Sequence, residues 1–84
     1  MTSSIYTDEM LALRDWLKTQ RKAQNLSMRH LAERMDKPHS FVQKVEQGER
    51  RLDVVEYVWY CAALGINPKM GIDLIKQHAH QQTP

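Results

Sequence analysis

The stretch that decides the fold is Pro38-His-Ser-Phe-Val-Gln-Lys-Val-Glu-Gln47, which divides into two faces when it is placed on a helix. At about 100° per residue, polar side chains without an acid share an arc of roughly 140°: His39, Ser40, Gln43, Lys44 and Gln47. Phe41, Val42 and Val45 fall on the opposite side. An ammonium, an imidazole, a hydroxyl and two amides suit phosphates and base edges, whereas an acid there would be repelled by DNA. The stretch therefore predicts a helix with one buried face and one face suited to nucleic acid.

Glu46 is the exception to this division, because it lies on the apolar side of the predicted helix. A carboxylate taken out of water without a partner is costly, so a cation from elsewhere in the chain should meet it.

Four further helices are predicted around this stretch, and no segment alternates as a strand does. Their approximate ranges are 8–24, 28–35, 53–65 and 68–78. The start signals are Thr7, Ser27, a capping box from Asp53 to Glu56, and Asn67 before Pro68. Pro38 is placed in the first turn of the central helix, Gly48 and Gly65 follow helix ends, and Gly71 weakens the last helix. The expected inward faces are Met10, Leu13, Leu17 and Arg21, then Met28, Leu31, Ala32 and Met35.

Composition bounds the class of protein. With 84 residues, of which 42% are apolar, the chain is expected to form one globular domain, 1–84, with a frayed tail at about 80–84. Cys61 has no second cysteine to pair with, which fits the reducing cytoplasm, and in its apolar helix it is expected to be a small buried hydrophobe. The first residues do not resemble a signal peptide, and the most apolar run, Val54 to Ile66, is too short for a membrane span.

Charge is distributed unevenly along the chain although the net charge is only +2. Between Arg14 and Arg51, ten Lys/Arg and five Asp/Glu leave +5, whereas two bases and five acids in the remainder leave −3. A basic middle between acidic ends indicates a nucleic-acid face, and the alternative is a set of ordinary solvated helix faces.

The two helices at 28–35 and 38–47 have the spacing of a helix-turn-helix, at about 27–48. Leu26-Ser-Met-Arg-His-Leu-Ala-Glu-Arg-Met35 followed by Ser40-Phe-Val-Gln-Lys-Val-Glu-Gln-Gly-Glu-Arg50 resembles the Cro/C1-type, or XRE, family. The resemblance extends loosely from Leu13 to Pro68. It implies an all-α, compact five-helix domain of the lambda-repressor type. This chain departs from the family pattern at Met28, where glutamine is common, and at Asp36, where a small residue is common.

The resemblance also implies roles for individual residues. Family members pair the glutamate of the third helix with an arginine of the first, which here predicts a shielded Arg21–Glu46 ion pair. Bases would be read by the start of the third helix and its next turn: His39, Ser40, Gln43 and Lys44. Phosphates would be contacted by Ser27, Arg29, Lys37, Gln47, Arg50 and Arg51.

The helix at 53–65 carries apolar residues all around, more than a domain of this size can bury. This predicts a homodimer through the last two helices, with Trp59, Ile66, Ile72 and Ile75 as interface candidates. The alternative is that both helices pack entirely within one chain.

The combined interpretation is a sequence-specific, double-stranded-DNA-binding regulator of bacterial or phage origin, most simply a dimeric repressor on a palindromic operator. An alternative is an antitoxin that binds a toxin and represses its own operon, and a third is a protein-interaction module without a DNA role. We expect no enzyme, cofactor or metal: the spacing of Ser, His and acids suggests no catalytic site, and His78-Ala-His80 cannot converge on an ion from a helix.

Overall fold

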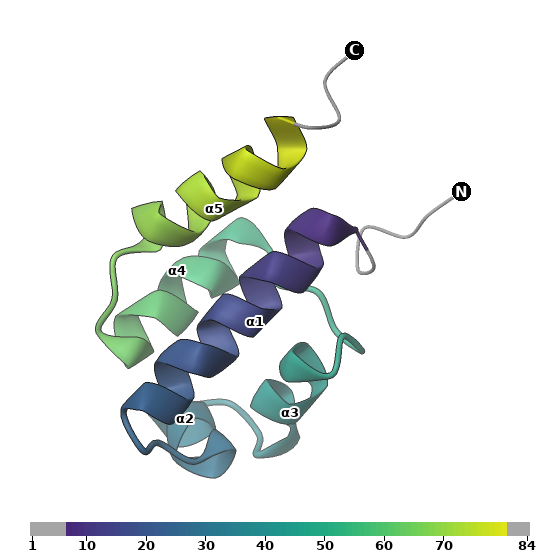
Figure 1. The fold of residues 1–84 in the computed structure, drawn as a ribbon. Coiled ribbons are helices and arrows are strands. Elements are labelled where there is room, and N and C mark those ends of the chain that lie inside the picture. The colour runs from purple at the N-terminus through teal and green to yellow at the C-terminus, as the bar shows by residue number, and fades with distance from the viewer. Residues whose placement is uncertain (1–6, 81–84) are drawn as a thin grey trace.

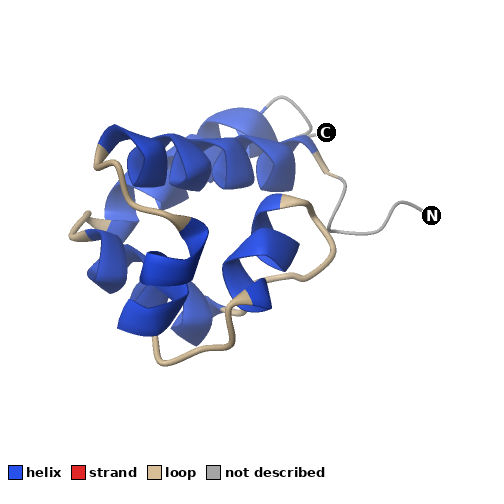
Figure 2. Cartoon of the chain, turned by 90° about the horizontal axis from the view of Figure 1, so that it is seen from below, coloured by secondary structure: helices blue, strands red, loops and turns tan. Residues whose placement is uncertain are grey.

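The computed structural model describes residues 7–80, and of residues 79 and 80 only the backbone. Within this range the chain forms five α-helices and no strand (Figure 2). The bounds are α1 (Asp8–Ala23), α2 (Met28–Arg34), α3 (Ser40–Glu46), α4 (Val54–Leu64) and α5 (Pro68–His80). The all-α prediction is confirmed, and every predicted boundary agrees to within two residues. The frayed tail expected from about residue 80 falls mainly on 81–84, outside the described residues.

The predicted helix starts are confirmed by their hydrogen bonds. Thr7 Oγ1 accepts from the Met10 N–H at 3.2 Å, and Ser27 Oγ accepts from the His30 N–H at 3.0 Å. At α4 the capping box is complete, because Asp53 Oδ1 accepts from the Glu56 N–H at 2.8 Å and Glu56 Oε1 accepts from the Asp53 N–H at 3.1 Å. These side chains satisfy N–H groups that the first turn of a helix leaves without backbone acceptors.

Two local predictions about α2 and α3 are wrong. Pro38 is not in the first turn of α3, which begins at Ser40; instead Pro38 O accepts from the Phe41 N–H at 2.9 Å, a tight turn that leads into the helix. Met28 does not point inward but is 37% exposed, because it is the first residue of α2 and lies at the edge of the helix pair.

The core lies where α1, α2, α3 and α4 meet. Its most buried large side chains, all less than 2% exposed, are Leu17, Leu31, Val42, Val45, Tyr60 and Cys61. The expected burial of Cys61 is thus confirmed. No helix in the described part of the chain is long and apolar enough to cross a membrane.

The fifth helix closes the far side of the molecule from α2 and α3 and runs beside α1 (Figure 1). Gly71, which weakened the prediction of α5, explains this close approach: a Cβ there would meet the Tyr57 hydroxyl and the Trp16 ring. Tyr57 Oη also donates to Pro68 O at 2.6 Å, which fixes the start of α5 on α4. The glycine is therefore a packing requirement, which outweighs its low helix propensity.

Candidate nucleic-acid interface

The turn between α2 and α3 sets the direction in which α3 leaves the core. Asp36 has φ +56°, in the left-handed region, and the Lys37 N–H donates to Ala32 O at 2.9 Å. Aspartate tolerates this conformation better than most side chains, although glycine does so at less cost. The departure from the family pattern at Asp36 therefore leaves the turn intact.

The two faces predicted for the central helix are present in the structure. Phe41, Val42 and Val45 are at most 5% exposed and belong to the core. All five polar residues of the opposite arc are exposed to solvent: His39, Ser40, Gln43, Lys44 and Gln47. We call these five residues the α3 polar face. It carries hydrogen-bond donors and acceptors and one ammonium, and it contains no carboxylate.

The α3 polar face is held in place by an ion pair behind it. Arg21 Nε donates to Glu46 Oε2 at 2.6 Å, and Arg21 Nη2 donates to Glu46 Oε1 at 3.1 Å. The side chains are only 9% and 6% exposed, so the charges are shielded from water. A third donor, Arg21 Nη1, reaches Leu26 O at 2.8 Å. The hydrogen-bonded Glu46 carboxylate raises the pKa of Arg21, despite the opposing effect of burial.

Arg50, expected to contact phosphate, is occupied by a second ion pair. Its Nη2 donates to Glu56 Oε2 at 2.7 Å and its Nη1 to Glu56 Oε1 at 3.0 Å. Its guanidinium also lies over the Phe41 ring, 4.7 Å from the centroid. The hydrogen bond from Arg50 lowers the pKa of Glu56 to about 2. Arg50 therefore has a structural role that sequence reasoning missed, because the capping box already gave Glu56 a partner in the Asp53 N–H.

Lys37, also expected to contact phosphate, is placed between α3 and α4. Its Nζ lies 5.4 Å from the centroid of the Phe41 ring and 5.4 Å from that of the Trp59 ring. Ammonium groups at such distances are attracted to aromatic faces. Lys37 thus joins the turn before α3 to the side of α4.

The other expected phosphate contacts, Ser27, Arg29, Gln47 and Arg51, are exposed. The structure adds two cations that the sequence argument left out, Lys18 and Lys22 of α1. They line a hollow of about 270 Å³ beside α3, together with Arg21, Met28, Gln43, Glu46 and Gln47. Their signal was positional, because Lys18 and Lys22 lie within one turn of Arg21 on the same helix.

The four candidates for a dimer interface are in two different environments. Trp59 and Ile72 are 50% and 45% exposed, whereas Ile66 and Ile75 are partly buried and pack against the core. Ile66 and Ile75 therefore already make contacts within one chain, and all four residues stay candidates for an interface.

Comparisons with known proteins agree with this geometry. The family model described as Helix-turn-helix (HTH_3) matches residues 17–69. An XRE-family like protein from Pseudomonas syringae pv. tomato is 36% identical, with a TM-score of 0.77 over 90% of this chain and 88% of that chain. The restriction-modification controller protein C.AhdI from Aeromonas hydrophila is 28% identical, with a TM-score of 0.71 over 77% of this chain and 98% of that chain.

A third structure, the clp gene regulator ClgR from Corynebacterium glutamicum, has a TM-score of 0.74 over 90% of this chain and 81% of that chain. At 20% identity it supports the fold alone. No curated protein sequence matches the chain. The family match over residues 17–69 and the 36% identity to the Pseudomonas protein show that this chain belongs to the XRE family of helix-turn-helix proteins.

Proposed function

We propose that this protein is a sequence-specific regulator of transcription that binds double-stranded DNA as a homodimer and represses the promoter it occupies. The observation that carries the proposal is the α3 polar face, which is exposed, free of acids and fixed by a buried ion pair. The family match, and the 28% identical controller protein among the similar structures, support the general class of DNA-binding regulator. The site of action would be the cytoplasm of a bacterial cell, for a chromosomal or a phage gene.

In this proposal α3 enters the major groove and its exposed side chains read base edges. Lys44 suits guanine O6 and N7 as a donor, and the amide of Gln43 suits adenine N6 and N7. His39 and Ser40, at the start of α3, would contact neighbouring bases. These side chains are exposed and held on a fixed helix, so little ordering of the backbone is needed on binding.

Phosphates would be held on both sides of the groove by residues around α3. Ser27, Arg29, Gln47 and Arg51 remain the candidates from the helix-turn-helix itself, and Lys18 and Lys22 of α1 join them. Arg50 and Lys37 line a hollow together with Ser40 and Lys44 of the α3 polar face. They would act mainly by supporting α3, because Arg50 is paired with Glu56 and the Lys37 ammonium lies over the rings of Phe41 and Trp59.

The test begins with selection of bound sequences from a random pool of duplex DNA, for which a dimer predicts a palindrome with half-sites one helical turn apart. Against the selected site, Lys44→Ala and Gln43→Ala should each cost about 1–3 kcal/mol and relax sequence preference. Arg29→Ala and Lys22→Ala should instead weaken all sequences alike and flatten the dependence of affinity on salt. Lys76→Ala is the matched control, since this exposed lysine lies on α5, away from α3 (Figure 1).

Equal behaviour of all four variants would contradict the division into base-reading and phosphate-contacting residues. Absence of any selected sequence would contradict the proposed function itself. Repression is tested separately, by placing the selected site within a promoter and measuring reporter output with and without the protein. The antitoxin hypothesis makes a different prediction, which is co-purification of a second protein encoded beside this gene.

A further inference from the structure

The solvent-facing side of α4 carries no polar side chain. Val54, Val55, Val58, Trp59 and Ala62 recur at helical spacing and share one arc of the helix, which we call the α4 outer stripe. Val54, Val55, Val58 and Trp59 are 79%, 55%, 46% and 50% exposed. The opposite side of α4 fills the core with Tyr57, Tyr60, Cys61 and Leu64. A helix with apolar side chains on both its core side and its solvent side is normally buried, so we expect another protein surface to pack on the α4 outer stripe.

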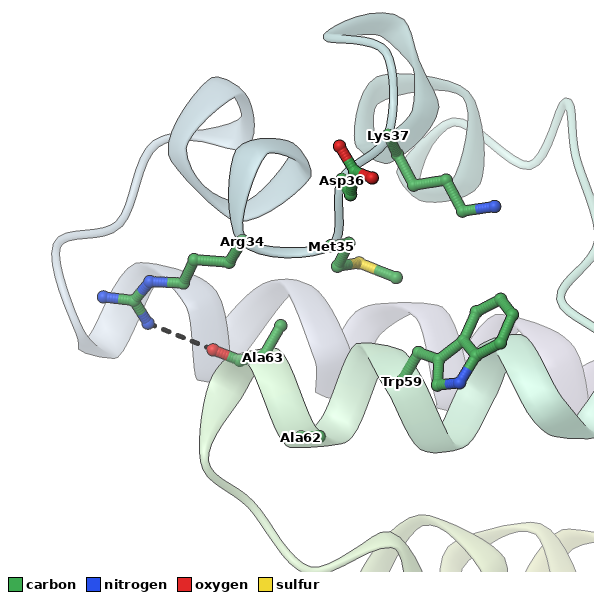
Figure 3. A pocket seen from close by; sticks show the side chains of 7 residues that line it. All are labelled: Arg34, Met35, Asp36, Lys37, Trp59, Ala62 and Ala63. Atoms are coloured by element: carbon green, nitrogen blue, oxygen red, sulfur yellow. Dashed lines mark hydrogen bonds between the residues drawn. The ribbon is translucent and has the colours of Figure 1, made fainter.

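The two ends of the stripe have opposite shapes. Val54 is the most exposed residue at its N-terminal end, whereas Ala62 at its C-terminal end lines a hollow of about 570 Å³. The rest of that hollow is formed by Trp59 and Ala63 of α4 and by the segment from Arg34 to Lys37 (Figure 3). Val54 and Ala62 are eight residues apart, or about 12 Å along the helix, and Val58 lies midway between them.

We propose that a second copy of this chain covers the α4 outer stripe, with the two α4 helices antiparallel about a two-fold axis beside Val58. In such an interface a residue that contacts another is contacted by it in turn. Each Val54 would then pack on the partner's Ala62 at the edge of the hollow, and the two Val58 side chains would meet at the axis. The proposal deepens the homodimer of the proposed function by assigning its surface.

Charge favours the antiparallel arrangement of two copies over a parallel one. Around the N-terminal end of α4, the two cations Arg50 and Arg51 balance the two carboxylates of Asp53 and Glu56. Around the hollow at the C-terminal end, Arg34 and Lys37 outnumber Asp36. Parallel packing would bring the two cationic ends together, whereas antiparallel packing would place each cationic end beside a balanced one. The dipoles of the two helices also oppose each other favourably in this arrangement.

The area of the stripe is of the size that such an interface needs. A standard interface buries about 800 Å² per partner, of which roughly 60% is apolar. At the observed exposures, the side chains of the stripe offer roughly 400 Å² per copy. The walls of the hollow, including the Met35 side chain and the alkyl part of Lys37, add to that area.

Sedimentation with two matched variants tests which surface is used. Val58→Glu places two carboxylates at the proposed axis and should raise the dimer dissociation constant at least about 100-fold. Ile72→Glu is the control, because Ile72 of α5 is 45% exposed against 46% for Val58. Helical circular dichroism and a thermal melt verify that both variants fold. A dimer that survives Val58→Glu, or a wild-type chain that stays monomeric at high micromolar concentration, overturns the proposal.

Cross-linking tests the antiparallel geometry without destabilising an interface. Under copper–phenanthroline oxidation, Val58→Cys should form a disulfide-linked dimer, whereas Ile72→Cys should not. Val54→Cys and Ala62→Cys should each fail alone, and the double variant should cross-link, because each cysteine would face its unlike partner. Cross-linking of Val54→Cys alone would indicate parallel helices and overturn the proposal. Wild-type chain is the background control, since Cys61 is buried.

The outcomes separate this inference from the proposed function. A chain that dimerises through the stripe but selects no DNA sequence would leave the interface standing and contradict the regulator. A chain that binds a selected site but dimerises through α5 would support the proposed regulator and contradict the proposed interface.

Discussion

Two arginine–glutamate pairs of similar geometry hold α3, and they differ in their access to water. Arg21–Glu46 joins α3 to α1 with side chains 9% and 6% exposed, whereas Arg50–Glu56 joins the following loop to α4 with 40% and 12% exposed. Both arginines donate to both carboxylate oxygens of their partner. When water is excluded, the attraction between two charges grows, and so does the cost of leaving one charge without its partner. The Arg21–Glu46 pair should therefore affect the free energy of unfolding more than the Arg50–Glu56 pair does.

The largest expected effect is the loss of one partner of the buried pair. Arg21→Met should lower the free energy of unfolding by about 3–5 kcal/mol, because Glu46 would be left in a shielded site without a cation. The loss of the bond to Leu26 O contributes to the same figure. Urea unfolding followed by circular dichroism measures this free energy. A loss below about 1 kcal/mol would contradict the larger contribution expected from the Arg21–Glu46 pair.

The matched control removes both charges. Arg21→Met combined with Glu46→Leu should recover most of the loss, because apolar side chains of similar volume often replace a buried pair without net cost. A double variant as unstable as the single one would indicate that packing around Arg21, rather than the stranded carboxylate, causes the loss.

The Arg50–Glu56 pair, whose arginine side chain is 40% exposed, should contribute less to stability. Arg50→Met should lower the free energy of unfolding by about 1–2 kcal/mol, because Glu56 can be rehydrated and still caps α4 through the Asp53 N–H. The same urea experiment measures this loss. An effect as large as that of Arg21→Met would mean that burial does not decide between the two pairs.

This difference between the pairs marks how much could be predicted from the sequence. The five helices, their capping residues and the two faces of α3 could be predicted because they depend only on the spacing and type of residues within each segment. The place of Glu46 on the apolar side called for a cation, and the family resemblance supplied Arg21. That pair is present in the structure.

The contacts of Arg50 and Lys37 could not be predicted in this way. Both depend on where α4 lies relative to the turn and loop around α3, which is a property of tertiary packing. For the same reason Gly71 counted against a helix in the sequence, although in the structure it admits Tyr57 and Trp16. The functional roles of the α3 polar face stay predictions until DNA binding is measured.

The dependence of stability on pH below 4.5 should report on the Arg50–Glu56 pair. Folding lowers the pKa of Glu56 from an ordinary value of 4.5 to about 2, so this carboxylate stabilises the fold above pH 4.5. As pH falls from 4.5 towards 2 the unfolded chain takes up the proton first, and this contribution, about 1 kcal/mol after screening by water, is lost. Glu56→Gln should remove that part of the pH dependence. An unchanged slope between pH 4.5 and 2 in the variant would contradict it.

The smallest expected effect concerns a hydroxyl beside the buried pair. Burial raises the pKa of Tyr60 and the charge of Glu46 adds to this effect, yet among residues 7–80 nothing hydrogen-bonds to its Oη. A buried hydroxyl without a partner costs free energy, so Tyr60→Phe should leave stability unchanged or raise it by up to about 1 kcal/mol. Tyr57→Phe is the matched control, because Tyr57 Oη donates to Pro68 O at 2.6 Å and its removal should cost about 1 kcal/mol. Urea unfolding of the two variants in parallel decides the point: if Tyr60→Phe destabilises the protein as much as Tyr57→Phe does, the hydroxyl has a partner, such as a buried water, and the surroundings of the Arg21–Glu46 pair are less dry than its exposure indicates.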